Sequence, residues 1–159
     1  MEFLFELYGT TRLDVKEILD WSYEQKQQFL RMQFEAQHRH YQAHFSSALF
    51  SVVLNRKNKR VGRFYLHQTE DEFRIVDIAI LPEHQQSGIG SALVKEVMEQ
   101  CRIAALPLRL HVAKWNRALA WYQGMGFKTI GETDMTFHME WSAAESITTS
   151  SEPLQLSQF

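Results

Sequence analysis

Apolar residues recur at helical spacing through the first third of the chain and then give way to strand-like runs. The helical pattern predicts helices over residues 2–8, 13–20 and 24–44, with Ser22 as the N-cap of the third. Runs rich in apolar and β-branched residues follow at 48–54, 61–67 and 73–81. Because short polar turns separate these runs, they are expected to form an antiparallel meander.

The second half of the chain alternates helices and strands. A helix is predicted after Gly88, with Ile89, Val97 and Cys101 on its apolar face. A strand, a short helix ended by Gly126 and two further strands are then expected, at residues 108–113, 117–125, 127–132 and 136–141. The mixture of strands and helices predicts one α/β domain over residues 1–142, and the polar residues 143–159 predict a flexible tail.

Composition narrows the classes of partner and the location. The 159 residues carry a formal net charge of −2, and the basic cluster within residues 56–60 lies in a predicted hairpin turn. Neither feature favours nucleic acid or an anionic membrane as a partner. The chain has one cysteine, no apolar run long enough to span a bilayer, and no signal-peptide pattern in its first residues. A cytoplasmic location is therefore expected.

The stretch PEHQQSGIGSALV, residues 82–94, joins a predicted strand to a predicted helix through a glycine-rich turn. Glycines at a helix N-terminus let backbone N–H groups approach an anion closely. A dinucleotide turn would need a third glycine where Leu93 stands, and a P-loop would need Lys-Ser/Thr where Ser91 and Ala92 stand. The remaining pattern is Gln85-x-x-Gly88-x-Gly90.

Gln/Arg-x-x-Gly-x-Gly/Ala after a strand resembles the signature of the GCN5-related N-acetyltransferases. The stretch KWNRALAWYQGMGFKTIGE resembles the second motif of that family, through Asn116, Ala118, Tyr122, Gly126 and Phe127. Closely similar motifs cover about residues 73–132, and the order of elements agrees over residues 48–141. The resemblance implies an acyl-CoA N-acyltransferase fold, a twisted mixed sheet flanked by helices. The first strand of the family is expected to be absent or very short, because the chain opens almost directly on the helix FLFELY.

The resemblance implies acetyl transfer from acetyl-CoA to a primary amine. The amides of residues 86–91 would hold the pyrophosphate, and the backbone of residues 78–80 would meet the pantetheine and the acetyl oxygen. The implied CoA-binding residues are Ile78, Ala79, Ile80, Gln85, Gln86, Ser87, Gly88, Ile89, Gly90, Ser91, Asn116 and Tyr122. Tyr122 matches the general acid of the family, and a phenol with a pKa of about 10 can protonate a departing thiolate. A buried structural tyrosine and a helix-capping asparagine are the plainer roles for Tyr122 and Asn116.

The residues that would bind the acceptor amine are less clearly indicated by the sequence than those that would bind CoA. Asp77 and His111 are alternative candidates for the base or the amine ligand; a structural ion pair, a packed strand histidine and a water chain are the competing explanations. The family places its first helices over the acceptor, which makes pocket candidates of Arg31, Gln37, His38 and Tyr41. His40 and His44 lie one helical turn apart, but without a third ligand no metal site is expected.

A small-molecule amine is the expected acceptor, because the composition shows no strongly charged surface for a polymer. A peptide or protein amine and a non-catalytic acyl-CoA sensor are the alternatives. Gln85-Gln86 stands where Arg-Gly is frequent in the family, so weaker CoA affinity is expected. A missing first strand would leave a sheet edge uncovered and invite pairing with a second copy as a homodimer.

Overall fold

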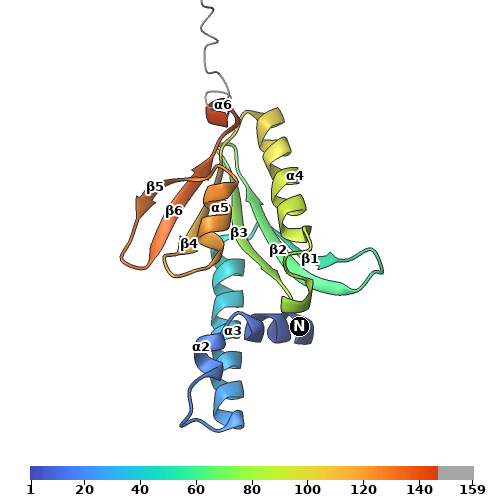
Figure 1. Cartoon of the computed structure of the whole chain (residues 1–159), viewed down its shortest axis with the longest axis vertical. Coiled ribbons are helices and arrows are strands. Elements are labelled where there is room, and N and C mark those ends of the chain that lie inside the picture. Colours follow the sequence, from blue (N-terminus) through green and yellow to red (C-terminus); the bar gives the residue numbers. More distant parts are fainter. Residues whose placement is uncertain (147–159) are drawn as a thin grey trace, which may run out of the picture. The chain divides into compact units, whose positions relative to one another are not determined.

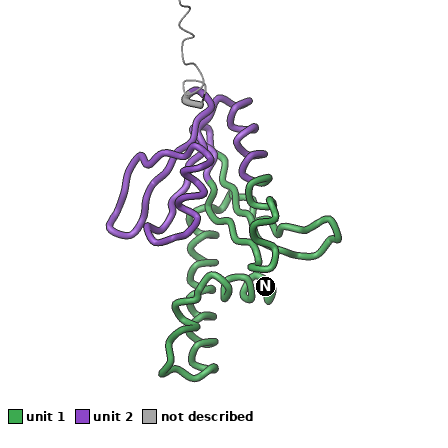
Figure 2. The backbone as a smooth tube through the Cα atoms, in the orientation of Figure 1, with its two compact units in different colours: residues 1–68, 75–93 green, residues 69–74, 94–159 purple. Residues whose placement is uncertain are grey.

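A computed structural model describes residues 1–146 of the chain. Six strands form one mixed sheet in the order β1-β2-β3-β4-β6-β5, and helices flank it (Figure 1). The backbone groups into two compact units, one of residues 1–68 and 75–93 and the other of residues 69–74 and the residues from 94 on (Figure 2). This architecture confirms the α/β class that the sequence predicts.

The first unit opens with the helices α1 (Glu2–Thr10), α2 (Leu13–Lys16) and α3 (Tyr23–His44). Ser22 caps α3 as predicted: its hydroxyl accepts a hydrogen bond from the Gln25 N–H, and the Gln25 side chain accepts one from the Ser22 N–H. These reciprocal bonds form a capping box. The apolar faces of the three helices meet in a core cluster of Phe5, Tyr8, Val15, Leu30 and Phe34.

Helix α2 is shorter than the predicted span of residues 13–20. It ends at Lys16, whose carbonyl oxygen accepts a hydrogen bond from Nζ of Lys26 on α3 at 3.0 Å. In a longer helix this carbonyl would accept the N–H four residues later. The side chain of Lys26 takes the place of that partner, so a contact from a distant helix accompanies the early end of α2.

The strands of the first unit form the predicted meander. Strand β1 (Leu49–Leu54) pairs antiparallel with β2 (Arg60–Gln68). The N–H of Leu81, just after β3 (Phe73–Ile80), donates to the Val61 carbonyl near the start of β2 at 2.8 Å. Opposite ends of β2 and β3 therefore meet, which makes this pair antiparallel as well.

The second unit contains the C-terminal part of α4 (Ile89–Ala104), and then β4 (Leu108–Ala113), α5 (Ala118–Gly124), β5 (Lys128–Glu132), β6 (Thr136–Trp141) and α6 (Ala143–Ser146). Strand β6 pairs antiparallel with both β4 and β5. The Phe73 N–H donates to the Pro107 carbonyl at 3.0 Å, so β3 and β4 begin side by side and run parallel. Buried residues of this unit include Val97, Cys101, Leu108, Leu110, Val112, Tyr122, Phe127 and Met139.

Two local predictions in the second unit are confirmed. Gly126 follows α5 with φ +97°, the left-handed conformation expected at a helix C-terminus. Cys101 is a buried thiol on α4, and burial raises its pKa to about 12. A thiol held protonated in this way is a packing residue rather than a nucleophile.

The remaining expectations concern the two ends of the sequence. Within the described residues, no strand precedes β1, in agreement with the absent first strand. The expected tail, residues 143–159, begins with the short helix α6, and its remainder lies outside the described residues. None of the helices formed by residues 1–146 is long and apolar enough to cross a bilayer.

Candidate functional site

The glycine-rich turn lies in the first unit, between the 3₁₀ helix η1 (Pro82–His84) and α4. Gln86 and Gly88 both have left-handed backbone, with φ +58° and +86°. The Ser87 hydroxyl donates to the His84 carbonyl at 2.5 Å, and the Gly88 carbonyl accepts the Ala92 N–H at 2.9 Å as α4 begins. Side-chain and backbone bonds thus hold the turn on both sides.

This turn has the properties of an anion site. The first N–H groups of an α-helix lack intrahelical acceptors, and the helix dipole places positive potential there. Left-handed residues in a short turn occur in the concave backbone arrangements called nests, which bind anions. A Cβ added to Gly88 would meet nothing within 4 Å, so the backbone is open to a ligand at this point. The turn therefore fits a phosphate-bearing ligand.

Gln85 makes a contact that the sequence did not indicate. Its side-chain amide donates to the Ile80 carbonyl at 2.8 Å, which ties the turn to the last residue of β3. On that strand Ala79 is buried, while Ile78 and Ile80 are partly exposed. The residues expected to bind the pyrophosphate and the pantetheine are therefore joined directly within one unit.

Asn116 and Tyr122 lie in the second unit. The Asn116 Oδ1 accepts the Ala118 N–H at 2.9 Å, but Arg117 is the N-cap of α5, so Asn116 binds the first N–H of the helix from one residue before the N-cap position. Its side-chain NH₂ makes no further hydrogen bond to the described residues, which leaves two donors for a ligand. Tyr122 on α5 is buried, and its ring packs at 5.5 Å edge-to-face on Phe127.

Asp77 belongs to a polar cluster in the first unit, together with residues of α3 and β2. Its Oδ2 accepts hydrogen bonds from Arg63 Nη2 at 2.6 Å and from the Tyr41 hydroxyl at 2.9 Å. The same Nη2 donates to Gln37 Oε1 at 2.9 Å. Burial, followed by the Asp77 charge, raises the pKa of Tyr41, which keeps its hydroxyl a donor. The ion pair considered from the sequence is therefore present, and two pocket candidates support it.

His111 lies in a second polar cluster, within the second unit. Its Nδ1 lies 3.2 Å from Arg74 Nη1, and its ring stands 4.2 Å from that of His138, the residue paired with it across β4 and β6. Burial, aided by these two neighbours, lowers the pKa of His111; burial and nearby arginines lower that of His138. Both imidazoles are thereby kept neutral near pH 7, the form that accepts protons.

The other two pocket candidates do not join the Asp77 cluster. The Arg31 guanidinium lies 4.1 Å from the centre of the Phe5 ring, and its Nη2 is 3.4 Å from Glu2 Oε1. The His38 ring stacks on Phe34 with 6.0 Å between centroids. Both side chains thus cover the helical core cluster, whereas Gln37 and Tyr41 reach the strands.

Arg63 is the polar residue of this region that sequence reasoning missed. It stands on β2 within an otherwise apolar run, and its side chain is only 4% exposed. A signal was available: the short turn at residues 69–72 sets the register of β2 and β3, which brings Arg63 close to Asp77. A buried strand cation and a carboxylate at diagonal positions on one face of a hairpin predict an ion pair.

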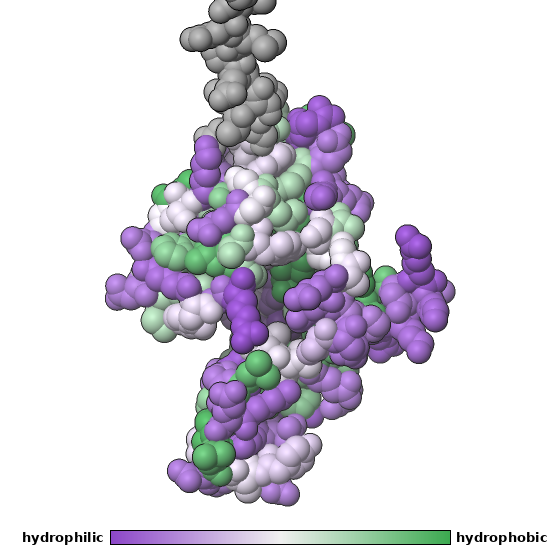
Figure 3. Space-filling model, viewed as in Figure 1, coloured by the Kyte–Doolittle hydropathy of each residue, from purple (hydrophilic) through white to green (hydrophobic). Residues whose placement is uncertain are grey.

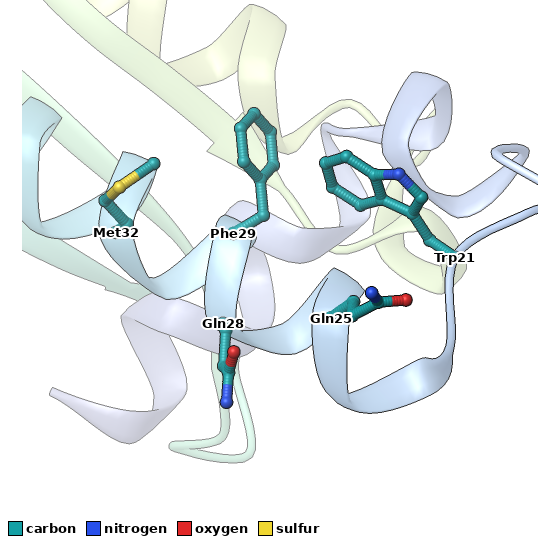
Figure 4. Close-up of a pocket in the computed structure, with 5 residues that line it drawn as sticks. All are labelled: Trp21, Gln25, Gln28, Phe29 and Met32. Atoms are coloured by element: carbon teal, nitrogen blue, oxygen red, sulfur yellow. The ribbon is translucent and has the colours of Figure 1, made fainter.

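An open hollow of about 390 Å³ lies elsewhere in the first unit. It is lined by residues of α3 and of the turn before it, Trp21, Gln25, Gln28, Phe29 and Met32 (Figure 4). The helices of this unit also carry exposed hydrophobic side chains, which stand out among hydrophilic ones in the space-filling view (Figure 3). None of the sequence-predicted site residues lines this hollow, and we assign no ligand to it.

Comparison with known families decides the class of the protein. Residues 46–129 match the family model described as an acetyltransferase (GNAT) domain. The chain belongs to the GNAT acetyltransferase family. This GNAT protein is therefore an acetyl-CoA-dependent N-acetyltransferase, as its two motifs predict. A comparison with curated proteins found no match to its sequence.

Solved structures share the fold of this acetyltransferase. PaiA N-acetyltransferase from Thermoplasma acidophilum, in complex with coenzyme A, has a TM-score of 0.66 at 20% identity, over 89% of this chain and 91% of that one. A GNAT acetyltransferase from Elizabethkingia anophelis with bound acetyl-CoA gives 0.55 at 17% identity, over 65% and 82%. The Vibrio cholerae spermidine/spermine N-acetyltransferase SpeG gives 0.54 at 21% identity, over 74% and 79%. At sequence identities of 17–21%, the similarity to these structures shows a shared fold alone.

Proposed function

We propose that this acetyltransferase transfers the acetyl group of acetyl-CoA directly to the primary amine of a small molecule, in a ternary complex. The observation that carries the proposal is the turn at residues 85–90. Its left-handed Gln86 and Gly88 and its open backbone precede the N-terminus of α4. Such a turn suits a pyrophosphate without requiring a lysine or a metal ion.

In this proposal the amides of residues 86–91 bind the pyrophosphate of acetyl-CoA. Gln85 joins the turn to Ile80 through its side-chain hydrogen bond and does not serve as a charged phosphate ligand. The coenzyme A and acetyl-CoA complexes among the structural neighbours support the choice of ligand. The NH₂ group of Asn116 provides donors to the coenzyme while its Oδ1 accepts the Ala118 N–H.

The reaction we propose has one nucleophilic step. The amine nitrogen attacks the thioester carbonyl carbon, and the N–H of Ile78 on β3 stabilises the oxyanion that forms. The C–S bond then breaks, the Tyr122 hydroxyl protonates the departing thiolate, and the amine gives up its extra proton to a base or to water. Asp77 holds the acceptor amine, and His111, neutral near pH 7, is the candidate proton acceptor.

A small molecule is the favoured acceptor. The net charge of −2 supplies no strong field to recruit a charged polymer. The structural neighbours include SpeG, a spermidine/spermine N-acetyltransferase, and a nourseothricin acetyltransferase. These names support a small amine as the acceptor class.

The test is an amine screen read by thiol release from acetyl-CoA, with CoA affinity measured by calorimetry. The panel contains benzylamine, spermidine, an aminoglycoside, free amino acids and a peptide with a free N-terminus. Rapid thiol release with a small amine is the expected result. Tight CoA binding without turnover on any amine would overturn the proposal in favour of a sensor, and turnover on the peptide alone would replace the acceptor class.

Gly88 provides a direct test of the coenzyme site, and Gly124 provides the control. Gly88→Val is expected to abolish CoA binding while the fold persists, because a β-branched residue resists φ +86° and fills the open space over the turn. Gly124→Ala, where an added Cβ also meets nothing within 4 Å but φ is ordinary, should bind CoA as the wild type does. Wild-type CoA affinity in Gly88→Val would exclude this turn as the pyrophosphate site.

A further inference from the structure

Arg63 is a buried cation that the reaction described above does not use. Its side chain is 4% exposed, and its Nη2 donates both to Asp77 Oδ2 at 2.6 Å and to Gln37 Oε1 at 2.9 Å. Its Nε is buried and has no hydrogen-bond partner among the residues that the structure describes. A buried guanidinium with an unsatisfied donor lowers the stability of the fold. Its position beside Asp77 therefore needs an explanation, and a function is one.

The two oxygens of Asp77 have different surroundings. Oδ2 is engaged by Arg63 and by the Tyr41 hydroxyl, whereas Oδ1 accepts no hydrogen bond within residues 1–146. The Asp77 side chain is 13% exposed. One oxygen is thus anchored to the protein, and the other remains able to accept a hydrogen bond from a ligand.

Among the described residues, the charged side chains of this cluster are those of Arg63 and Asp77. Gln37 and Tyr41 reach Asp77 and Arg63 from α3, and Tyr65 lies beside Arg63 on β2, with 5.3 Å between the guanidinium carbon and the ring centre. Burial raises the pKa of both tyrosines, so they stay neutral. The positive charge of Arg63 therefore balances the negative charge of Asp77.

We propose that Arg63 is a positioning residue that makes the Asp77 site bind the acceptor as a neutral amine, with release of the ammonium proton. This rests on the proposed function, in which Asp77 holds the amine. An unpaired carboxylate would favour an ammonium ion, which cannot attack a thioester. With Arg63 beside it, Asp77 Oδ1 still accepts an N–H bond, but a second cation at this site meets like-charge repulsion.

The released proton is the quantity to measure. A free alkylammonium has a pKa of about 10.4, so at pH 8 nearly all of the amine is protonated before binding. Titration of benzylamine, or of the fastest acceptor in the panel, into the wild-type protein saturated with CoA is followed by calorimetry in two buffers of different ionisation enthalpy. Release of about one proton per bound amine is expected, and release of none would overturn the inference.

Charge-altering variants separate this role from a structural one. In Arg63→Gln, loss of the cation should move the acidic limb of the kcat–pH profile to higher pH by about one unit or more. Arg63→Lys keeps the charge and should keep the limb at the wild-type pH, even where kcat falls. An unchanged limb in a folded Arg63→Gln would refute the proposal; if that variant does not fold, the wild-type proton count decides.

Arg12 supplies the control, because it pairs with Asp14 at 2.8 Å in the same unit and has no part in the Asp77 cluster. Arg12→Gln should leave both the proton count and the pH profile unchanged. Failure of the proposed function gives a different result: if no amine of the panel is acetylated, both proposals fall. Acetylation without proton release on binding overturns the role of Arg63 alone.

Discussion

Gly62 on β2 allows a close approach to β3, and replacing it with alanine tests that approach. A Cβ added to Gly62 would lie 2.4 Å from the Ala79 carbonyl oxygen and 2.6 Å from Ile80 Cδ1. The Ile80 side chain can rotate, but the Ala79 carbonyl belongs to the backbone of β3. Gly62→Ala must therefore push the two strands apart at Ala79 and Ile80, which are expected to contact the pantetheine.

The change in stability caused by Gly62→Ala is the sum of two opposing effects. Overpacking of this kind typically destabilises a protein by about 1–3 kcal/mol. Replacing a strand glycine with alanine returns about 0.5–1 kcal/mol, because the unfolded chain loses freedom. At the midpoints of these two ranges, the net loss is about 1 kcal/mol. For a chain of this size, each kcal/mol lowers Tm by about 2–4 °C, so Tm should fall by about 2–4 °C.

Thermal and urea unfolding measure this loss, and Gly131 on β5 provides the matched control. An added Cβ there would meet its nearest neighbour, the His138 Cβ, at 3.8 Å, an ordinary contact. Gly131→Ala should therefore be neutral or slightly stabilising. Gly62→Ala should also lower kcat, because the displaced backbone carries the proposed acetyl site. Equal stability of the two variants would refute the close approach as the reason for glycine at position 62.

Three further predictions follow from the second unit. Tyr122→Phe should lower kcat by about 100-fold or more with little change in KM for acetyl-CoA, the usual scale for a general acid; a wild-type kcat would remove Tyr122 from the mechanism. Ala105 has φ +55° just after α4, so Ala105→Gly should stabilise the fold by about 1 kcal/mol in urea unfolding, whereas Ala104→Gly, at the last residue of the helix, should destabilise it. The lowered pKa values of His111 and His138 mean that the unfolded state, with values near 6.5, binds more protons. Stability should therefore fall as pH drops below about 6.5, and replacing both histidines with glutamine should flatten that slope between pH 7.5 and 5.5; an unaltered slope would contradict these shifts.

The secondary structure was predictable because its signals are local. Strands β4 and β6 have the predicted bounds, and Ser22 caps α3 as its side chain suggests. The end of α2 was not predictable, since it coincides with a hydrogen bond from Lys26, ten residues away in sequence. Periodicity reports which face of an element is apolar, but not which distant side chain will satisfy a backbone group.

The candidate site likewise has a part that local sequence signals predict and a part that they do not. Two motifs alone identified the family and the coenzyme turn, because a phosphate is held by backbone groups whose conformation depends on local residues such as Gly88. The left-handed conformation of Gln86 was not visible in the sequence, since non-glycine residues adopt it only when their surroundings require it.

The sequence by itself determined the class of the protein, its element order and the place of its coenzyme turn. Only the tertiary structure decided that Asp77 is held by Arg63 and Tyr41 rather than left as a lone carboxylate. Its partners come from α3 and β2, outside the strand that carries it. The charge state of a buried group depends on what packing brings within a few ångströms of it, and that distance is set by the fold as a whole.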